Sequence, residues 1–364
     1  MLQHSDLKLE CMAIGSLPHK NPEEAMNLVK ECFLDIPFWP QLTKKSKKED
    51  MMIQYLENMP SFSLNDVGNV VLDSESDEFY SNLESFFLDY EEVVNGNDLT
   101  KLEKYGISQE YSSTFRPFLN LLNDGKYKYA KGQIVGPFTL ATSLTDKNKK
   151  CAIYDETLAE IIVKTLTLKA IWQVKQMQNA ALNIQPIIFI DEPSLSQIGT
   201  SAFLTISEQN VVDMLKSIVD EIHKFGGIVA IHCCGKCDWS IPIKSGIDIV
   251  NLDAVNYSKN LSLFYEDIMH LFSRGGKLAW GVVPTLDKKL LSNMSINDAV
   301  KIFEHSVNYL TEKGIDEKLI IDNSIVTPSC GAGGLTVELA EKAMQLAKEL
   351  SSVLKKKYQN QIGE

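Results

Sequence analysis

Short apolar runs alternate with amphipathic helical patterns along this chain of 364 residues, and that alternation limits the folds it can adopt. The eight runs are residues 11–14, 36–39, 129–135, 187–190, 227–231, 249–252, 278–283 and 319–321. Apolar runs bounded by turn signals and mostly followed by helical patterns are typical of parallel strands with crossover helices. Eight such runs favour a closed ring, so the sequence predicts an α/β fold, a single (β/α)8 TIM barrel over residues 1–364.

The segments between the runs carry apolar residues at helical spacing. Two such sets are Val211, Leu215, Ile218 and Ile222, and Leu335, Leu339, Ala343, Leu346, Leu350 and Val353. This spacing places each set on one face of a helix that packs on the strands.

Residues 43–128 interrupt the alternation, because they are too many for one crossover connection. Between Ser61 and Thr100 they contain ten acidic residues and no Lys or Arg. We expect a mostly helical, acidic insertion after the second strand of the barrel. Its acidity fits a solvated face, and it also fits a docking surface for a basic partner.

Charge and hydropathy exclude several classes of protein. A net charge of −12 argues against nucleic acid or an anionic membrane surface as the main partner. No stretch reaches the ~18 apolar residues of a membrane helix, and the N-terminus lacks the pattern of a signal peptide. The expected compartment is the cytoplasm, where seven cysteines indicate metal or redox chemistry and not a disulfide framework. The sequence is compatible with an oligomer.

Polar residues gather where the predicted strands end, which is where the active sites of such barrels lie. They are Ser16, Gln41, Asp191, His232, Cys234 and Asp253, with Cys330 in the loop after the last run. We expect these side chains to share one site.

A metal site is the first interpretation of this group. His232 and Cys234 stand two residues apart at a strand end, so their side chains point the same way and can bind one ion. Cys330 lies in the glycine-rich segment 327–334, whose backbone can turn tightly around a thiolate. One imidazole and two thiolates suit zinc, and three protein ligands leave a fourth position open, as in catalytic sites. Asp253 could fill that position when substrate is absent.

Three other interpretations of the cysteines stay open. Cys234 and Cys237 form a C-x-x-C pair, which is typical of a redox dithiol. Cys233, Cys234 and Cys237 together with His232 could form a structural zinc site without Cys330. The cysteines could also be buried and inert.

Two shorter motifs are candidates for substrate binding. Asp-Glu-Pro at 191–193 forms a rigid carboxylate corner that could bind an ammonium group or a metal, or act as acid or base. It equally fits a helix N-cap followed by proline at the first helical position. Ile14, Gly15 and Ser16 offer a backbone that a ligand can approach closely and one hydroxyl group.

In this order the motifs resemble the catalytic C-terminal barrel of cobalamin-independent methionine synthase, in the superfamily that includes uroporphyrinogen decarboxylase. The resemblance covers most of the chain. Segment 14–16 is similar to the family's Ile-Gly-Ser motif for the carboxylate of homocysteine, and Asp191 to the Asp that binds its amino group. The resemblance implies that His232, Cys234 and Cys330 bind zinc.

Further positions match the family or depart from it. Asp253 stands where the family has a Glu that serves as fourth zinc ligand, and segment 136–139, Gly-Pro-Phe-Thr, is similar to a strand-end motif of the superfamily. Gln41 stands near the place of a Glu that contacts the amino group of homocysteine. Residues 282 and 283, both Val, replace a catalytic His. The family enzyme pairs two barrels, and this chain has room for one.

The resemblance therefore implies a zinc-dependent methyltransferase that moves a methyl group to the thiol of homocysteine or a similar thiol. Segment 14–16, Gln41 and Asp191 would bind the amino acid, and Asp191 and Asp253 would be the catalytic residues. The expected donor is a methylated corrinoid protein and not folate. The alternatives are a uroporphyrinogen decarboxylase-like enzyme, although no Arg occurs near the first strand end, and a non-catalytic zinc-stabilised protein that binds a corrinoid partner or a thiol.

Overall fold

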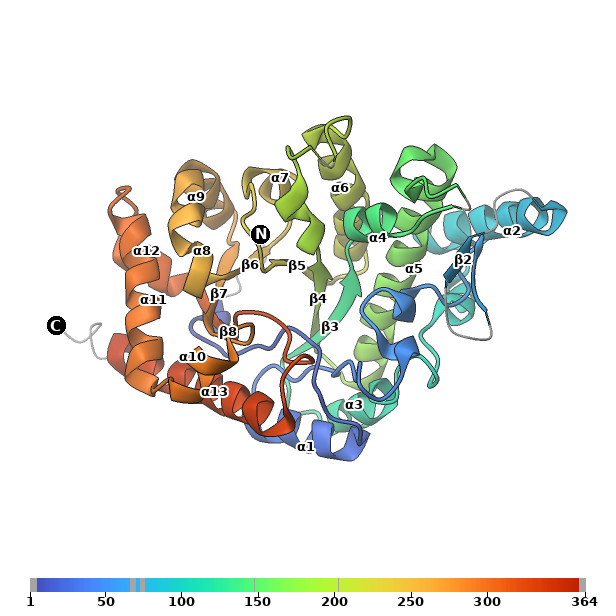
Figure 1. Ribbon diagram of the computed structural model, residues 1–364. Helices are drawn as coiled ribbons and strands as arrows, with labels where there is room; N and C mark the ends of the chain where they lie inside the picture. Colours follow the sequence, from blue (N-terminus) through green and yellow to red (C-terminus); the bar gives the residue numbers. More distant parts are fainter. Residues whose placement is uncertain (1–4, 66–69, 73–75, 147, 202, 360–364) are drawn as a thin grey trace.

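A curled sheet of six parallel strands forms the centre of the computed structural model, which describes residues 5–65, 70–72, 76–146, 148–201 and 203–359. The strands are β3 (Tyr129–Val135), β4 (Gln185–Asp191), β5 (Ile228–Cys233), β6 (Ile249–Asp253), β7 (Lys277–Val283) and β8 (Ser324–Pro328). They are hydrogen-bonded in sequence order, and they curve about one axis with the helices outside (Figure 1). Since all strands run the same way, their C-terminal ends meet at one edge of the sheet.

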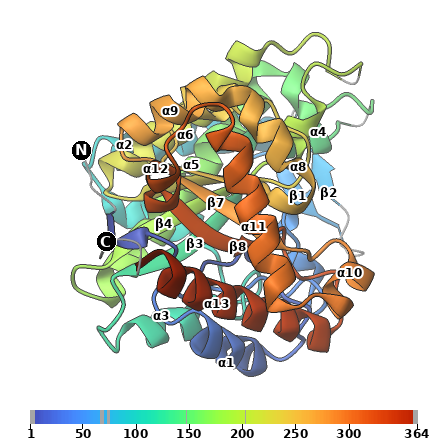
Figure 2. The same ribbon diagram turned by 90° about the vertical axis from the view of Figure 1, so that its left-hand side faces the viewer.

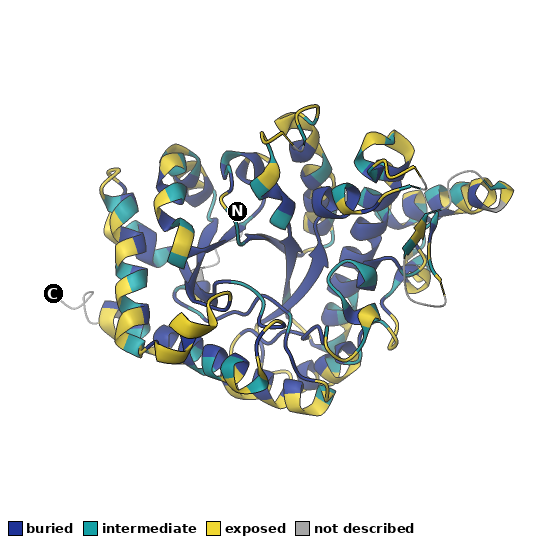
Figure 3. Ribbon diagram, in the orientation of Figure 1, coloured by how far each residue is buried: buried dark blue, intermediate teal, exposed yellow. Residues whose placement is uncertain are grey.

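Helices connect the strands and cover the outer face of the sheet, and their own outer faces are exposed (Figure 3). Along this part of the chain they are α4 (Pro137–Ser143), η5 (Ala152–Tyr154), α5 (Glu156–Ala180), η6 (Pro193–Gln197), α6 (Glu208–Lys224), α7 (Ser240–Lys244), α8 (Ala254–Leu261), η7 (Ser262–Phe264), α9 (Tyr265–Ser273), α10 (Lys288–Asn293), α11 (Ile296–Thr311), α12 (Glu317–Asp322) and α13 (Val337–Gln359). Within the described ranges, no helix has the length and apolar character needed to cross a membrane.

The N-terminal segment carries η1 (Ser5–Leu7) and α1 (Pro22–Cys32). Helix α1 packs beside α13, so the first and the last α-helix of the chain lie side by side (Figures 1 and 2). Lys348 of α13 donates a hydrogen bond to the main-chain oxygen of Glu31 at 2.8 Å.

The predicted closed barrel of eight strands is wrong, because the first two apolar runs do not form strands. They lie between β8 and β3 and reach their neighbours through isolated bridges. The bridges are Cys11 with Val326, Ser16 with Gln41, and Phe38 with Lys131. Pro37 and Pro40 have no N–H group, so the second run cannot build a ladder of hydrogen bonds. The sheet is therefore curled but six-stranded, with extended chain along its two edges.

The eighth predicted strand was also misplaced. Residues 319–321 lie in α12, whose first turn is capped by Asp316 through its side-chain oxygen and the N–H of Leu319. The strand that pairs with β7 is β8, which begins at Ser324 opposite Leu278. Three apolar residues in a row fit a short helix as well as a strand, so their pattern alone could not separate the two.

Residues 43–128 contain η2 (Lys47–Glu49), η3 (Ile53–Tyr55), β1 (Phe62–Leu64), β2 (Val70–Leu72), α2 (Asp77–Val94), η4 (Leu99–Tyr105) and α3 (Phe115–Leu122). Strands β1 and β2 form a small antiparallel sheet that was not predicted. Part of the acidity is neutralised internally, because buried Asp89 pairs with Lys101 and Lys104 at 2.8 Å each. The single-domain organisation and the docking role of this segment stay predictions.

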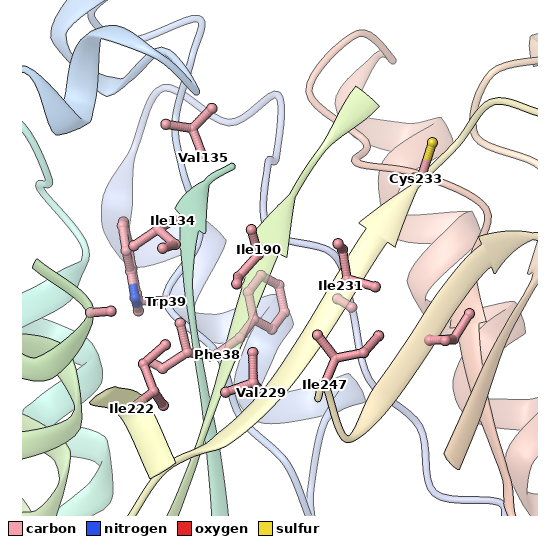
Figure 4. Packing of buried hydrophobic residues seen from close by; sticks show 14 of the residues in the cluster. Phe38, Trp39, Ile134, Val135, Ile190, Ile222, Val229, Ile231, Cys233 and Ile247 are labelled. Atoms are coloured by element: carbon pink, nitrogen blue, oxygen red, sulfur yellow. The ribbon is translucent and has the colours of Figure 1, made fainter. Parts of the chain in front are cut away.

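One cluster of buried apolar side chains lies on each face of the sheet. The outer cluster lies between strands and helices and includes Ile134, Ile190 and Ile231, which project from β3, β4 and β5 (Figure 4). The inner cluster lines the concave face; it comprises Leu7, Met12, Ile14, Ile36, Tyr129, Ile187, Phe189, Ile228, Ala230, Ile249, Ala279 and Ile325. Side chains alternate along a strand, so the residues two positions after Phe189, Ala230 and Ile249 also face inward. They lie nearer the C-terminal edge of the sheet, and they are Asp191, His232 and Asn251.

Candidate metal and substrate site

His232, Cys234 and Cys330 come together at this C-terminal edge. The imidazole nitrogen and the two Sγ atoms that could bind a metal all lie within 4.8 Å of one another. His232 is near the end of β5 on its inner face, and Cys234 follows two residues later. Cys330 follows β8. Within the part of the chain that the structure describes, no other group of three or more His, Cys, Asp or Glu residues meets the same criterion.

Asn251 on β6 sets the proton position on His232. Its Oδ1 lies 2.5 Å from His232 Nδ1, while its Nδ2 donates to the main-chain oxygen of Ala279 at 2.8 Å and to Thr327 Oγ1 at 2.7 Å. Because the amide nitrogen is committed to these acceptors, Oδ1 must accept and Nδ1 must carry the proton. The lone pair of a neutral His232 is therefore on Nε2, which is buried and has no hydrogen-bond partner among the described residues. This is the arrangement that orients a metal-binding histidine.

Sequence reasoning missed Asn251, although a signal was present. It is the polar residue inside the apolar run 249–252, and it stands two residues before Asp253, so both face the same side of the strand. The register of the sheet places it directly opposite His232 on β5.

Replacing Asn251 by leucine is expected to weaken zinc binding about 10- to 100-fold, because His232 loses the group that fixes its tautomer and ring orientation. The dissociation constant can be measured by competition with a chromophoric chelator. The matched control is Asn323→Leu. Asn323 is also buried, but its side-chain amide forms hydrogen bonds with Leu319 and Lys277, away from the three candidate zinc ligands. Equal zinc affinity for Asn251→Leu and the unchanged protein would contradict this role.

The arrangement of the three candidate ligands stabilises a negative charge on the sulfur of Cys234. The neighbouring Cys330 thiol and then the His232 ring stabilise the thiolate of Cys234 and lower its pKa to about 4. The charge on Cys234 in turn raises the pKa of Cys330. Burial opposes the protonated form of His232, but the nearby Cys234 and Asp191 outweigh it and raise the pKa of the imidazole. Cys234 is thus held in the form in which cysteine binds metals.

The remaining cysteines of this segment face elsewhere. Cys233 points into the outer apolar cluster at the end of β5 (Figure 4), and its sulfur interacts with that of buried Cys237, which lowers the pKa of Cys233. The sulfur pairs are therefore Cys234 with Cys330 and Cys233 with Cys237. All seven cysteines are described and none forms a disulfide. This pairing favours the ligand set with Cys330 over the set built from 233, 234 and 237.

Asp191 lies beside the metal group, since it ends β4 directly opposite His232 on β5. It is buried, and its Oδ1 has no hydrogen-bond partner among the described residues. Burial raises the pKa of this carboxyl to about 6, against the opposing effects of His232 and Lys131. A buried carboxylate oxygen normally has a partner, so Asp191 is suited to receive a donor such as a substrate ammonium group.

Glu192 has a structural role. Its carboxylate accepts hydrogen bonds from the N–H of Phe138 at 2.8 Å and from the N–H and hydroxyl of Thr139 at 2.9 and 2.6 Å. These groups form the first turn of α4, and burial raises the pKa of Glu192 to about 7. Within the Asp-Glu-Pro motif, therefore, only Asp191 faces the site.

Ser16 connects the predicted substrate segment to the loop of Cys330. Its main-chain oxygen accepts a hydrogen bond from the N–H of Ala332 at 2.9 Å, and its Oγ accepts one from the N–H of Gly333 at 3.3 Å. A Cβ atom on Gly331 would lie 2.2 Å from Ser16 Oγ, so glycine is needed for this approach. Segment 14–16 and the loop that carries Cys330 thus pack directly against each other.

Gln41 lies next to segment 14–16 with its amide orientation fixed. Its Nε2 donates to Gln54 Oε1 at 2.8 Å and to the hydroxyl of Tyr55 at 3.3 Å. Its Oε1 faces Gly15, where an added Cβ would lie 3.2 Å from it. Gln54 and Tyr55 belong to η3, far from any predicted strand end, and no sequence motif indicated them.

Asp253 is buried at the end of β6, but its carboxylate is not part of the 4.8 Å group. Its oxygens accept hydrogen bonds from the N–H and the side-chain Nδ2 of Asn256, at 3.2 and 2.7 Å, and so cap α8. Burial raises the pKa of Asp253 above its ordinary value. Its roles as fourth zinc ligand and as a catalytic residue stay predictions.

Comparison with known proteins finds a distant relative. No protein-family model matches the chain. A methionine synthase of Methanocaldococcus jannaschii is 28% identical over 228 residues, which are 62% of this chain and 65% of that protein.

Two solved structures are more distant, both 11% identical. One is an uncharacterized protein with a TM-score of 0.28, covering 65% of this chain and 66% of that chain. The other is a prolidase complexed with N-methylphosphonate-L-proline, with a TM-score of 0.27, covering 62% of this chain and 57% of that chain. These scores are too low to bear on the fold. The chain is thus related in sequence to a methionine synthase over 62% of its length.

Proposed function

We propose that this protein is a zinc-dependent methyltransferase that moves a methyl group to the thiol of homocysteine, with a methylated corrinoid protein as donor. The observation that carries the proposal is the group of His232, Cys234 and Cys330 beside the open carboxylate oxygen of Asp191. The sequence relationship to a methionine synthase supports a methyl transfer to a thiol.

The donor set fits zinc. A buried imidazole nitrogen without a partner, such as His232 Nε2, costs about 1–3 kcal/mol unless something binds it. Two sulfurs and one nitrogen suit zinc better than magnesium or calcium, which prefer oxygen ligands. Three protein ligands leave one position for a substrate sulfur. We propose that Asp253 occupies this position before the thiol binds, for which it would have to release Asn256.

When bound, zinc would keep the acceptor thiol deprotonated at neutral pH, although a free thiol has a pKa of about 8.5. The residues of the chain orient the rest of the amino acid. Asp191 accepts hydrogen bonds from the ammonium group, Gln41 Oε1 offers a second acceptor, and segment 14–16 receives the carboxylate. Holding the acceptor in one orientation removes much of the entropic cost of bringing its sulfur to the methyl group.

The donor is inferred from the end of β7. Val282 and Val283 are buried there, and neither can give a proton to a leaving group. A methyl group leaves a folate nitrogen only when that nitrogen is protonated, which requires a general acid. In transfer from a corrinoid, the new sulfur–carbon bond forms while the cobalt–carbon electron pair stays on cobalt, so no proton is needed.

Adding homocysteine to the zinc-loaded protein is expected to raise the number of sulfur ligands on zinc from about two to about three. X-ray absorption at the zinc edge measures this number. With methylcobalamin as donor, methionine should form, whereas methyltetrahydrofolate alone should give only background. Robust turnover with methyltetrahydrofolate would overturn the donor assignment. A sulfur count unchanged by homocysteine would overturn the acceptor role and leave a non-catalytic zinc-stabilised protein.

A further inference from the structure

Lys131 is a fully buried lysine on the inner face of β3. Its Nζ donates to the main-chain oxygen of Ile14 and to Gln133 Oε1, the latter at 2.9 Å. It also lies 4.4 Å from the centre of the Phe189 ring. Asp191 is the carboxylate that acts on it, through space.

A charge in this position is costly. Burial lowers the pKa of Lys131 to about 7, because the ammonium form loses its hydration and gains only neutral hydrogen-bond partners, and the charge of Asp191 opposes this shift only in part. A carbonyl and an amide satisfy its hydrogen bonds but do not neutralise its charge. An apolar side chain of similar length would fill the same space without this cost, so the buried charge indicates a functional role.

Lys169 shows what a structural buried lysine does in this protein. It is also fully buried, and its Nζ donates to the main-chain oxygens of Tyr105 and Gly106 at 3.2 and 3.5 Å. These carbonyls end η4, where a cation stabilises the last turn. The carbonyl bound by Lys131 belongs instead to Ile14, in the segment to which we assign the substrate carboxylate.

The neighbours of Lys131 converge on the same segment. A Cβ atom on Gly15 would lie 3.2 Å from Gln41 Oε1 and 3.3 Å from the Cδ atom of Gln133, which binds Lys131. The positive charge therefore lies next to segment 14–16, and the negative charge of Asp191 lies beside the metal group. Such a separation of charge complements a zwitterionic amino acid, whose carboxylate and ammonium groups are both bonded to the α-carbon and can point toward opposite charges.

We propose that Lys131 is a specificity-determining residue, whose buried charge makes the pocket select a thiol that carries a carboxylate over the same thiol without one. The inference rests on the proposed function for the thiol acceptor, and it adds the group that recognises the acid end. Lys131 is a positioning residue and not a catalytic one, because its hydrogen bonds go to Ile14 and Gln133 and it acts through segment 14–16 and through its field.

The test compares homocysteine with 3-aminopropane-1-thiol, which lacks only the carboxylate. Binding of each thiol to the cobalt(II)-substituted protein is followed by the sulfur-to-cobalt charge-transfer absorption. In Lys131→Met the dissociation constant of homocysteine should rise about 10- to 100-fold, the effect of one charge across several ångströms at an effective dielectric constant of about 20. The constant for 3-aminopropane-1-thiol should not rise, since this thiol has no group for that charge to attract and its ammonium group is repelled by it.

Two variants control the comparison. Lys131→Gln can still donate to the Ile14 oxygen without a charge, so it should lose the preference as well, and it serves if Lys131→Met does not fold. Lys169→Met removes an equally buried lysine away from the site and should keep the preference. If both thiols bind cobalt and the Lys131 variants keep the preference of the unchanged protein, the inference is overturned while the proposed function stands. If neither thiol binds cobalt in the unchanged protein, the proposed function itself fails.

Discussion

Replacing Cys330 by serine is expected to lower the affinity for zinc by about 1,000-fold or more, so that the protein loses its metal during purification. The unchanged protein should retain one zinc per chain. A serine hydroxyl stays protonated at neutral pH and is a poor zinc ligand, and His232 and Cys234 alone leave an incomplete set. Because Cys330 lies in a partly exposed loop and not in a strand, the fold should survive the change.

Zinc content after gel filtration, measured by atomic emission, checks this expectation, and circular dichroism checks the fold. Cys237→Ser is the matched control, because its sulfur contacts Cys233 and not the candidate ligands. It should retain zinc. The opposite pattern, with zinc kept in Cys330→Ser and lost in Cys237→Ser, would support the structural site built from residues 232–237.

Adding one methyl group at Gly136 should reduce the free energy of unfolding by about 3 kcal/mol or more, the upper end of the range for overpacking at a buried site. In Gly136→Ala the new Cβ would lie 1.9 Å from Cδ and 2.0 Å from Cγ of Glu192. The backbone at Gly136 is extended, with φ −73° and ψ 148°, so the penalty is steric and not conformational. Glu192 cannot move away without breaking its hydrogen bonds to Phe138 and Thr139.

Urea unfolding followed by circular dichroism measures this loss. The control is Gly334→Ala, where an added Cβ meets no atom within 4 Å and stability should change by less than about 1 kcal/mol. Adding Glu192→Ala to Gly136→Ala removes the clash, so the double variant should lose less stability than the sum of the two single variants. A Gly136→Ala protein as stable as the unchanged one would refute the close packing of Glu192 against this turn.

Strand periodicity explains why part of the metal group could be predicted. On a strand, residues two apart face the same side, so His232 and Cys234 could be assigned to one ion before any fold was known. The expected strand at residues 129–135 coincides with β3, because the segment ends in Ile134 and Val135 and is closed by Gly136 and Pro137. In both places the relevant contacts are local in sequence, and local spacing is what a sequence displays.

Prediction failed where a local signal against a strand was overlooked or where the outcome depended on a distant partner. The run 36–39 is apolar, yet Pro37 and Pro40 prevent a ladder, and single bridges hold it beside β3. Residues 319–321 are helical because Asp316 caps them and β8 takes the position next to β7. A short apolar run is compatible with either structure until its neighbours are known.

By itself, the sequence determined that this is an α/β chain with inward-facing His, Cys and Asp side chains at strand ends, because alternation along a strand is a local rule. Only the tertiary structure decided which sulfurs pair, which nitrogen of His232 is free, and that Gln54, Tyr55 and Lys131 contact Gln41 and segment 14–16. These are contacts between segments far apart along the chain. They depend on register and on the curl of the sheet, which no local pattern encodes.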